Sequence, residues 1–467
     1  MGGSWRSKQL GTAGTLASPP IRLLRQWDWA LYGLILLYMA LPQVYRSYSV
    51  YLIGNAIPDT SALATVAQWG FIELMIEVVQ ETFVLGIFFF VGRTILQGGH
   101  PGYPMRTALS IIFWVSLVFS LFLFVSARLF VDVIGTPESI QQTTISFLRL
   151  KSLSVPITLI TVALVIMVET VNRKRLILAT AVLNVLYRFV FDSLFYGGYP
   201  FSLDLGVMGV AWADISSGVA LLTTILFLLR GSLFASVRSW RAFFAFHEWR
   251  TYLGVSTGSG LESLVKNLAY FFMIVRLLNL LGEDSISGYY LAMHIIWSFA
   301  LVPILALSEC LKVLVATFSS DLQRVRRLWY ASMLIGLLII LVWVLLVPLW
   351  RSFATFLNPS QATVTFSVRT VTPLFVPYVI LALNLVTDSV FYGLGRTRYM
   401  AYQSIIVNGT IYVAAFLAYV TGTWIPTFDT VMYLFASGIM LDSVLTLYFL
   451  QRVLAKGPEL RSIAATN

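Results

Sequence analysis

Three stretches of the chain contain no charged residue, and each is long enough to cross a lipid bilayer. They cover residues 107–127, 328–350 and 399–428, and a membrane-spanning helix needs about 20 apolar residues. Only 11% of all residues are charged, compared with about 25% in soluble domains. These features predict an integral membrane protein and exclude soluble enzymes, nucleic-acid-binding proteins and secreted disulfide scaffolds.

Cysteine content and net charge restrict the ligands further. The single cysteine, Cys310, excludes an intrachain disulfide and a metal site built from several cysteines. The net charge of +10 is typical of basic cytoplasmic loops in a membrane protein and requires no nucleic-acid partner. We therefore expect no metal, no cofactor and no catalytic residue, with the lipid bilayer as the surrounding medium.

Hydropathy along the chain predicts twelve membrane-spanning helices. Their approximate bounds are 29–53, 67–91, 107–130, 146–171, 176–197, 206–229, 252–280, 287–317, 328–349, 367–393, 400–421 and 428–453. Helices and closed barrels are the structures that satisfy every backbone group inside a bilayer, and the alternating pattern of barrel strands is absent. The first 27 residues lack the apolar segment of a signal peptide, so we interpret them as a cytoplasmic tail.

Positive residues are distributed unevenly between the two sides of this helix map. Of the 31 Lys and Arg residues, 21 lie in segments predicted to be cytoplasmic and five on the opposite side. An excess of Lys and Arg marks cytoplasmic loops. The bias predicts that both termini are cytoplasmic and agrees with an even number of spans. We expect a monomer that crosses the cytoplasmic membrane many times.

Short patterns recur at similar offsets in the two halves of the chain. Val155-Pro156 is matched by Val376-Pro377, and Asn184 by Asn408. Parallel repeats of six helices are a transporter plan. We therefore predict an all-α polytopic membrane protein with two six-helix lobes related by a pseudo-two-fold axis along the membrane normal. The expected segments are a tail at 1–27, a first lobe at 28–229, a linker at 230–251, a second lobe at 252–453 and a tail at 454–467.

Acidic residues inside the predicted helices are the main functional candidates, because a charge in mid-bilayer costs at least about 2.5 kcal/mol. Glu73, Glu77 and Glu81 lie one turn apart on one face of the second helix. We expect at least one of these carboxylates to be protonated or paired with a cation, because three adjacent charges repel one another. The stripe is either a cation or proton site or a set of structural partners for Arg46 or Arg188.

Other residues inside the helices give further candidates. Asp388 has no basic residue within one turn, whereas Glu262 precedes Lys266 by one turn and can pair with it. The residues expected to line a substrate cavity are Asp214, Asn184, His294 and Lys266. A hydrogen-bonded core position is an alternative role for His294. Kinks are expected at the prolines inside helices, namely Pro42, Pro156, Pro303 and Pro377.

Several motifs resemble the multidrug and toxic compound extrusion (MATE) family. They are Asn184 with Phe191-Asp192-Ser193-Leu194, Gly206-Val207-Met208-Gly209-Val210-Ala211, Gly260-Leu261-Glu262-Ser263, and Asp388-Ser389-Val390-Phe391-Tyr392-Gly393. The resemblance implies two lobes around a V-shaped cavity and export driven by Na⁺ or H⁺. It also implies that Glu262 and Asp388 are the acidic cation-site residues of the second lobe. Where the family commonly has an Asp in the first helix, this chain offers Ser49, so a first-lobe cation site is absent or is rebuilt from the helix-two stripe.

We therefore predict a secondary-active exporter of amphipathic, drug-like organic cations, coupled to Na⁺ or H⁺, and not an enzyme. The alternative function is a flippase for lipid-linked oligosaccharide or polysaccharide precursors, which needs a basic patch for a pyrophosphate. Clustering of basic residues in the cavity would favour the flippase; the candidates are Arg46, Arg188, Lys266 and Arg276. An intramembrane hydrolase using Ser256 and His294, and a channel, are less consistent with the sequence.

Overall fold

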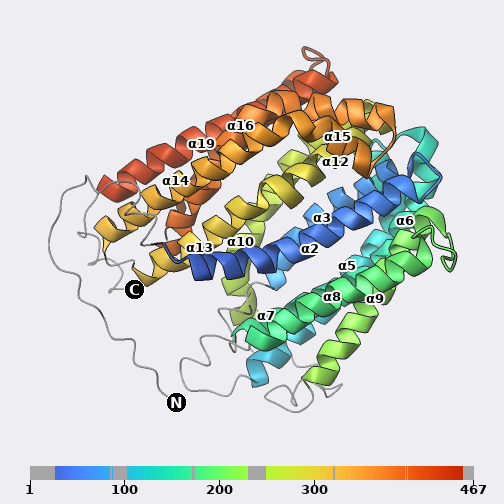
Figure 1. The fold of residues 1–467 in the computed structure, drawn as a ribbon, viewed down its shortest axis with the longest axis horizontal. Helices are drawn as coiled ribbons and strands as arrows, with labels where there is room; N and C mark the ends of the chain where they lie inside the picture. Colours follow the sequence, from blue (N-terminus) through green and yellow to red (C-terminus); the bar gives the residue numbers. More distant parts are fainter. Residues whose placement is uncertain are drawn as a thin grey trace.

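The computed structural model describes residues 27–84, 87, 102–170, 174–229, 249–318, 321–394, 396 and 398–455 (Figure 1). Within these ranges the chain forms helices joined by turns, and no strand occurs in them. The side chains of Ser256 and Glu262 lie outside the described part of the molecule. So do most of the predicted linker and most of the two predicted tails.

The first half of the chain runs from α2 to α9. Its helices are α2 (Trp29–Asn55), α3 (Ala62–Phe83), α5 (Gly102–Ile134), α6 (Gln141–Ser152), α7 (Ser154–Thr170), α8 (Lys174–Phe195) and α9 (Gly206–Leu228). The helices of the second half are α10 (Trp249–Tyr270), α11 (Arg276–Leu280), α12 (Glu283–Ile295), α13 (Val302–Thr317), α14 (Leu322–Leu346), α15 (Trp350–Leu357), α16 (Gln361–Gly393), α17 (Arg398–Val407), α18 (Val413–Val420) and α19 (Phe428–Ala455). Short π-helical segments join α10 to α11, α12 to α13 and α17 to α18.

These helices correspond to the spans predicted from hydropathy. In the described ranges, nine helical stretches are long and apolar enough to cross a membrane, and eleven are if each of two bent pairs is one span. The remaining predicted span is α2, which has 27 residues. The prediction of an all-α, multi-pass fold is confirmed.

Two of the four predicted kink sites coincide with bends. The chain bends by 41° between α6 and α7, just before Pro156, and by 49° between α12 and α13, just before Pro303. Proline lacks the N–H that would continue the hydrogen-bond ladder, and its ring clashes with the preceding turn. Pro42 and Pro377 lie inside the continuous helices α2 and α16.

Buried apolar side chains form two hydrophobic clusters, one mainly from α3 to α9 and the other mainly from α10 to α19. α2 contributes to both clusters. Tyr32, near its start, packs in the second cluster, whereas Val50 and Ile53, near its end, pack in the first. α2 therefore passes from one group of helices to the other, and Figure 1 shows it between them.

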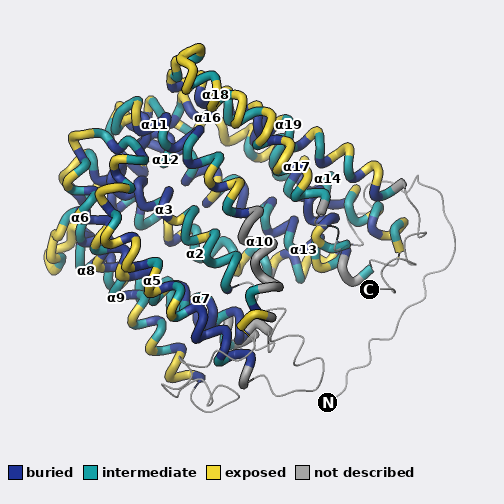
Figure 2. Tube along the Cα trace, turned by 180° about the vertical axis from the view of Figure 1, so that it is seen from behind, coloured by how far each residue is buried: buried dark blue, intermediate teal, exposed yellow. Residues whose placement is uncertain are grey.

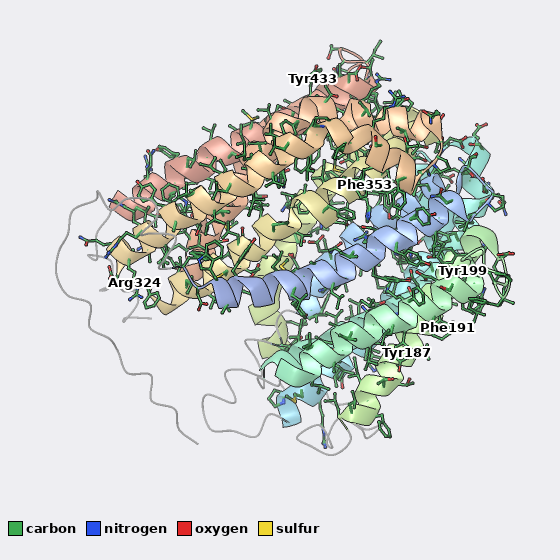
Figure 3. The ribbon with its side chains drawn as sticks, in the orientation of Figure 1. Tyr187, Phe191, Tyr199, Arg324, Phe353 and Tyr433 are labelled. Carbon is green, nitrogen blue, oxygen red and sulfur yellow. The ribbon has the colours of Figure 1, made fainter. Side chains whose placement is uncertain are left out.

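The outer faces of the helices expose large apolar side chains. Leu121 and Val125 on α5 are 62% and 69% exposed, and Leu345 on α14 is 69% exposed. Buried residues gather where helices face one another and exposed residues lie along the outer faces (Figure 2). Tyr433 on α19 is an exposed aromatic residue of this kind (Figure 3). Such extensive apolar surface suits lipid and not water, so the chain is a multi-pass membrane protein.

Hydrogen bonds link the two groups of helices directly. Gln68 Nε2 on α3 donates to Asn279 Oδ1 on α11 at 2.6 Å, and both side chains are buried. At the end of α2, Asn55 Nδ2 donates to the carbonyl oxygens of Phe356 and Leu357 in α15, at 3.3 and 3.2 Å. The groups of helices are therefore joined through α3 and α11 and through the ends of α2 and α15.

Candidate functional site

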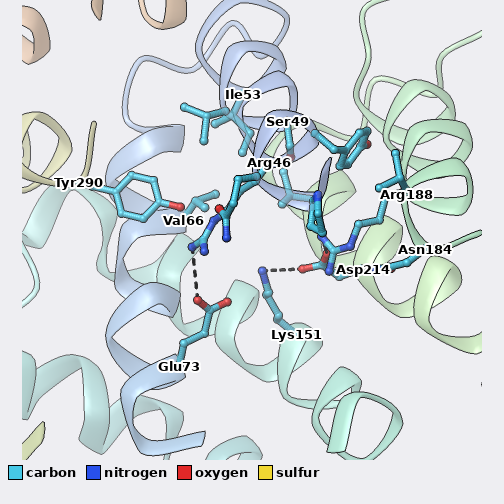
Figure 4. Close-up of a pocket in the computed structure, with 16 residues that line it drawn as sticks. Arg46, Ser49, Ile53, Val66, Glu73, Lys151, Asn184, Arg188, Asp214 and Tyr290 are labelled. Atoms are coloured by element: carbon cyan, nitrogen blue, oxygen red, sulfur yellow. Dashed lines mark ion pairs between the residues drawn. The ribbon is translucent and has the colours of Figure 1, made fainter. Parts of the chain in front are cut away.

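A polar cavity of about 290 Å³ lies among α2, α3, α6, α8 and α9, and Tyr290 of α12 completes its wall (Figure 4). Its lining residues are Pro42, Gln43, Tyr45, Arg46, Ser49, Val50, Ile53, Val66, Glu73, Lys151, Asn184, Val185, Arg188, Val210, Asp214 and Tyr290. The lining combines charged groups with an apolar wall, as in pockets that bind small molecules. The volume suits a head group with a short apolar portion.

Asp214 on α9 is the centre of a charged network in this wall. Its Oδ2 lies 2.6 Å from Lys151 Nζ, and its Oδ1 lies 3.0 Å from a guanidinium nitrogen of Arg188. The Lys151 and Asp214 side chains are 8% and 16% exposed, whereas that of Arg188 is 41% exposed. A buried charge is stabilised when it is paired and hydrogen-bonded, so Asp214 ties α6, α8 and α9 together.

Close packing of α9 on the end of α8 positions this network. A Cβ atom at Gly209 would lie 2.8 Å from the carbonyl oxygen of Phe195. Glycine therefore permits an approach that any other residue would prevent. Asp214 follows on the same helix and meets Arg188 on α8. Lys151 reaches the carboxylate from the last turn of α6.

A second ion pair in the cavity is much looser. Arg46 on α2 and Glu73 on α3 approach to 3.6 Å, and their side chains are 49% and 47% exposed. The distance exceeds that of a good hydrogen bond. The Tyr290 hydroxyl points toward Arg46 from the opposite wall (Figure 4). Both charged groups of this pair therefore face the cavity.

Hydrogen bonds behind the cavity hold α2 against α8. The Tyr45 hydroxyl donates to Asp192 Oδ2 at 2.5 Å, and Asp192 is only 3% exposed. The Ser49 and Tyr196 hydroxyls are 2.8 Å apart. Ser49, which stands where the MATE resemblance leads one to expect an Asp, thus lines the cavity as a neutral group that bonds to Tyr196.

A second polar cluster lies between α16, α17 and α19. Asn384 Nδ2 donates to Asp388 Oδ2 at 3.3 Å and to Asp442 Oδ2 at 2.9 Å. Thr446 donates to Asp388 Oδ1 at 3.3 Å, and Gln403 Nε2 donates to Thr446 Oγ1 at 2.6 Å. Among the described residues, neither carboxylate forms an ion pair. The side-chain oxygens of Asn384 and Gln403 are buried without a hydrogen-bond partner.

The three acidic residues predicted to form a stripe, Glu73, Glu77 and Glu81, lie on α3 and do not converge on a single site. Glu73 lines the cavity and pairs with Arg46, which is the structural alternative for this residue. Glu77 is exposed and Glu81 is half-buried, and neither lines the cavity. Asn184, predicted as a cavity residue, does line it, one turn before Arg188 on α8.

Two predicted cavity residues lie elsewhere. His294 is buried on α12, with Nε2 3.0 Å from the Ser47 hydroxyl and Nδ1 3.3 Å from that of Ser298. It is the hydrogen-bonded core histidine of the alternative interpretation. Lys266 is exposed on α10 and is not part of the cavity lining. Glu262, also on α10, has a side chain outside the described residues.

Lys151 is a site residue that was not expected from the sequence, because it is one of the five basic residues that the helix map places on the non-cytoplasmic side. Lys151 instead lies one turn after Phe147 on the buried face of α6, and both residues are buried. The one-turn spacing of Phe147 and Lys151 in a polar segment is the sequence signal that could have identified Lys151 as a buried residue. Within the described ranges, no group of three or more His, Cys, Asp or Glu residues is arranged to hold a metal ion.

Membrane-spanning helices with charged side chains converging on a cavity between them are typical of proteins that carry a substrate or an ion across a membrane. Residues 259–420 match the MatE family model. The resemblance to the MATE family is thereby confirmed, and members of that family are transporters and not enzymes. Comparison with curated protein sequences gives no match.

Solved structures extend the likeness to nearly the whole chain. An inward-facing multidrug resistance MATE family transporter of the MOP superfamily matches with a TM-score of 0.73 and 15% identity, over 91% of this chain and 98% of that one. The outward-facing conformation of such a transporter matches with a TM-score of 0.68 and 17% identity, over 94% and 98%. A MOP superfamily transporter from Pyrococcus furiosus, described as having a binding pocket of reverse polarity, matches with a TM-score of 0.68 and 15% identity, over 94% and 98%. The described part of the chain therefore has the fold of the MATE transporters.

Proposed function

We propose that this protein is a secondary-active exporter that moves amphipathic small molecules across the membrane by alternating access. The observation that carries the proposal is the polar cavity, whose charged residues come from five helices of a chain with the MATE fold. A charge inside a membrane protein is costly and usually marks a substrate or ion path. The cavity is the substrate site in this proposal.

The coupling ion binds in the second lobe, at Asp388 and Asp442. The two carboxylates share one amide donor, Asn384, and no ion pair within the described residues compensates their charge. One Na⁺ or one proton would supply the missing positive charge. Binding of that cation drives transport if it favours one orientation of the lobes over the other. Glu262, on α10, is a further candidate in this proposal because of the family resemblance alone.

The lining of the cavity also supports the alternative function, transfer of a lipid-linked precursor. Arg46 and Arg188, two of the basic residues that this alternative requires, line the cavity, and Lys151 is a third base. A pyrophosphate would need such a group of cations. In both functions the protein acts as a monomer in the cytoplasmic membrane. Both of its termini lie in the cytoplasm in this proposal, because the distribution of Lys and Arg favours that orientation.

Transport in proteoliposomes tests the proposal, with Na⁺ and pH gradients imposed separately. The expected result is substrate movement driven by one of the two gradients and lost in Asp388→Asn and in Asp442→Asn. Asp429→Asn is the matched control, because Asp429 is an exposed carboxylate that pairs with Arg369 on the protein surface. Gradient-driven transport that survives both second-lobe substitutions would contradict the coupling site, and the absence of transport under any gradient would contradict the function.

A further inference from the structure

The charges that face the first-lobe cavity are not evenly balanced. Three basic and two acidic side chains line it. The carboxylate of Asp214 forms ion pairs with two of the bases, Lys151 and Arg188, through one oxygen for each. A further carboxylate, Asp192, lies behind the wall, where it is buried and accepts a hydrogen bond from Tyr45. The side chains that line the cavity therefore include one base more than they include acids, and Asp192 lies behind them and is not part of the lining.

Arg46 is the base best placed to contact a ligand. Half of its side chain is exposed, and its ion pair with Glu73 spans 3.6 Å, which is longer than a charge-assisted hydrogen bond. A guanidinium has five N–H donors in a planar fork that fits carboxylate and phosphate oxygens. Arg188, with 41% of its side chain exposed, offers a second guanidinium on the α8 wall of the same cavity (Figure 4).

An apolar strip accompanies these guanidinium groups. Val50 and Ile53 on α2, Val66 on α3, Val185 on α8 and Val210 on α9 line the same cavity. A ligand with a charged head and a short hydrocarbon segment could place its head on the arginines and its apolar segment along the valines. Burial of that segment contributes to binding in proportion to the apolar area removed from water.

We propose that the first-lobe cavity binds the oxyanion head, a carboxylate or a phosphate, of an amphipathic substrate, with Arg46 as its principal contact and Arg188 as its second. The inference rests on the proposed transport function and names the substrate class of that site. It differs from the drug-like cation expected from the sequence. Glu73 then competes with the substrate for Arg46, whereas a cationic substrate would use Glu73 as its anchor.

Neutralising each member of the loose ion pair tests this assignment. The variants Arg46→Gln and Glu73→Gln are compared with the wild-type full chain in non-ionic detergent, and Asp429→Asn is the control. Binding is measured for hexyl phosphate and for hexyltrimethylammonium, which share an apolar body and differ in head charge. We expect Arg46→Gln to weaken hexyl phosphate binding by about tenfold or more, since it removes a bidentate charge-assisted contact. Glu73→Gln should leave that binding unchanged or tighten it.

Three results would overturn the proposal. The first is wild-type binding of hexyl phosphate by Arg46→Gln. The second is tight binding of hexyltrimethylammonium that is lost in Glu73→Gln. The third is an equal loss in both variants that the double variant restores, because a purely structural ion pair behaves in that way. If Arg46→Gln does not fold, Arg46→Lys keeps the charge without the planar fork, and unaltered hexyl phosphate binding in that variant would refute the bidentate contact.

Two further measurements identify the source of the head group. They also distinguish failure of the oxyanion site from failure of the transport function. Uptake of hexyl phosphate into proteoliposomes identifies a free organic anion, whereas redistribution of phosphatidic acid between vesicle leaflets identifies a lipid; both depend on Arg46 under the proposal. Arg46-dependent binding without transport of either probe would contradict the transport function and leave the oxyanion site in place. Gradient-driven transport of the trimethylammonium probe alone would support the transporter and overturn the oxyanion site.

Discussion

Replacing Asp214 by asparagine is expected to destabilise the protein more than replacing either of its basic partners. Asparagine keeps the size of the side chain and one acceptor oxygen, so the substitution removes mainly the charge. Lys151, whose side chain is 8% exposed and lies 2.6 Å from the carboxylate, then retains a buried and unpaired ammonium group. Removing one partner of a buried ion pair costs about 3–5 kcal/mol.

Substitutions of the two basic partners, Lys151 and Arg188, are expected to lower the stability by graded amounts. Lys151→Met leaves Asp214 paired with Arg188 at 3.0 Å and places an apolar side chain in a buried position, so its loss of stability should be smaller. Arg188→Gln should have the smallest effect of the three, because the Arg188 side chain is 41% exposed and solvent screens much of its interaction. Asp429→Asn breaks an exposed pair with Arg369 and is expected to cost about 0–1 kcal/mol.

Thermal unfolding in detergent at one fixed scan rate measures this order, since membrane proteins commonly unfold irreversibly and their midpoints depend on the rate. The expected order of decreasing midpoint is Asp429→Asn, Arg188→Gln, Lys151→Met and Asp214→Asn. A midpoint for Asp214→Asn that equals that of the wild type would refute the claim that this carboxylate compensates a buried lysine. A lower midpoint for Arg188→Gln than for Lys151→Met would show that exposure does not set the order.

Two further substitutions test the packing between helices. Gly288→Ala should lower the unfolding midpoint, because the added Cβ would clash with Phe366 Cβ and overpacking costs about 1–3 kcal/mol. Gly409→Ala, with nothing within 4 Å of its Cβ, should have a much smaller effect. Gln68→Ala should lower the unfolding midpoint by leaving the buried Asn279 Oδ1 without its donor, a loss of about 1–3 kcal/mol. A wild-type midpoint for either Gly288→Ala or Gln68→Ala would contradict the contact described for it.

Helix positions could be predicted from the sequence because each span needs a long apolar segment, and that requirement is local. The predicted span at 206–229 agrees with α9, Gly206–Leu228. Ends were less predictable where polar residues continue a helix. The predicted span at 107–130 is shorter at both ends than α5, Gly102–Ile134, because charged and small residues at the ends of the helix interrupt the hydropathy without interrupting the hydrogen bonds.

Charge partners could be predicted only in part, because they depend on contacts between distant segments. The sequence indicates that Arg46 or Arg188 could pair with the helix-two acids, and Arg46 does pair with Glu73. It does not show that Arg188 pairs with Asp214 instead. The helix map places Lys151 on the non-cytoplasmic side, and its burial depends on contacts with distant segments, namely Trp69 of α3 and Asp214 of α9.

The contact between α2 and α15 has a consequence for how easily the lobes can part at that end. Asn55 acts as a helix cap supplied by another segment, since it binds two of the last carbonyl groups of α15, those of Phe356 and Leu357, which no backbone N–H of their own helix can reach. Asn55 is exposed, so water can replace it as soon as the helices separate. A hydrogen bond that water can replace contributes only about 0.5–1.5 kcal/mol net. The contact between α2 and α15 can therefore break and re-form at low cost.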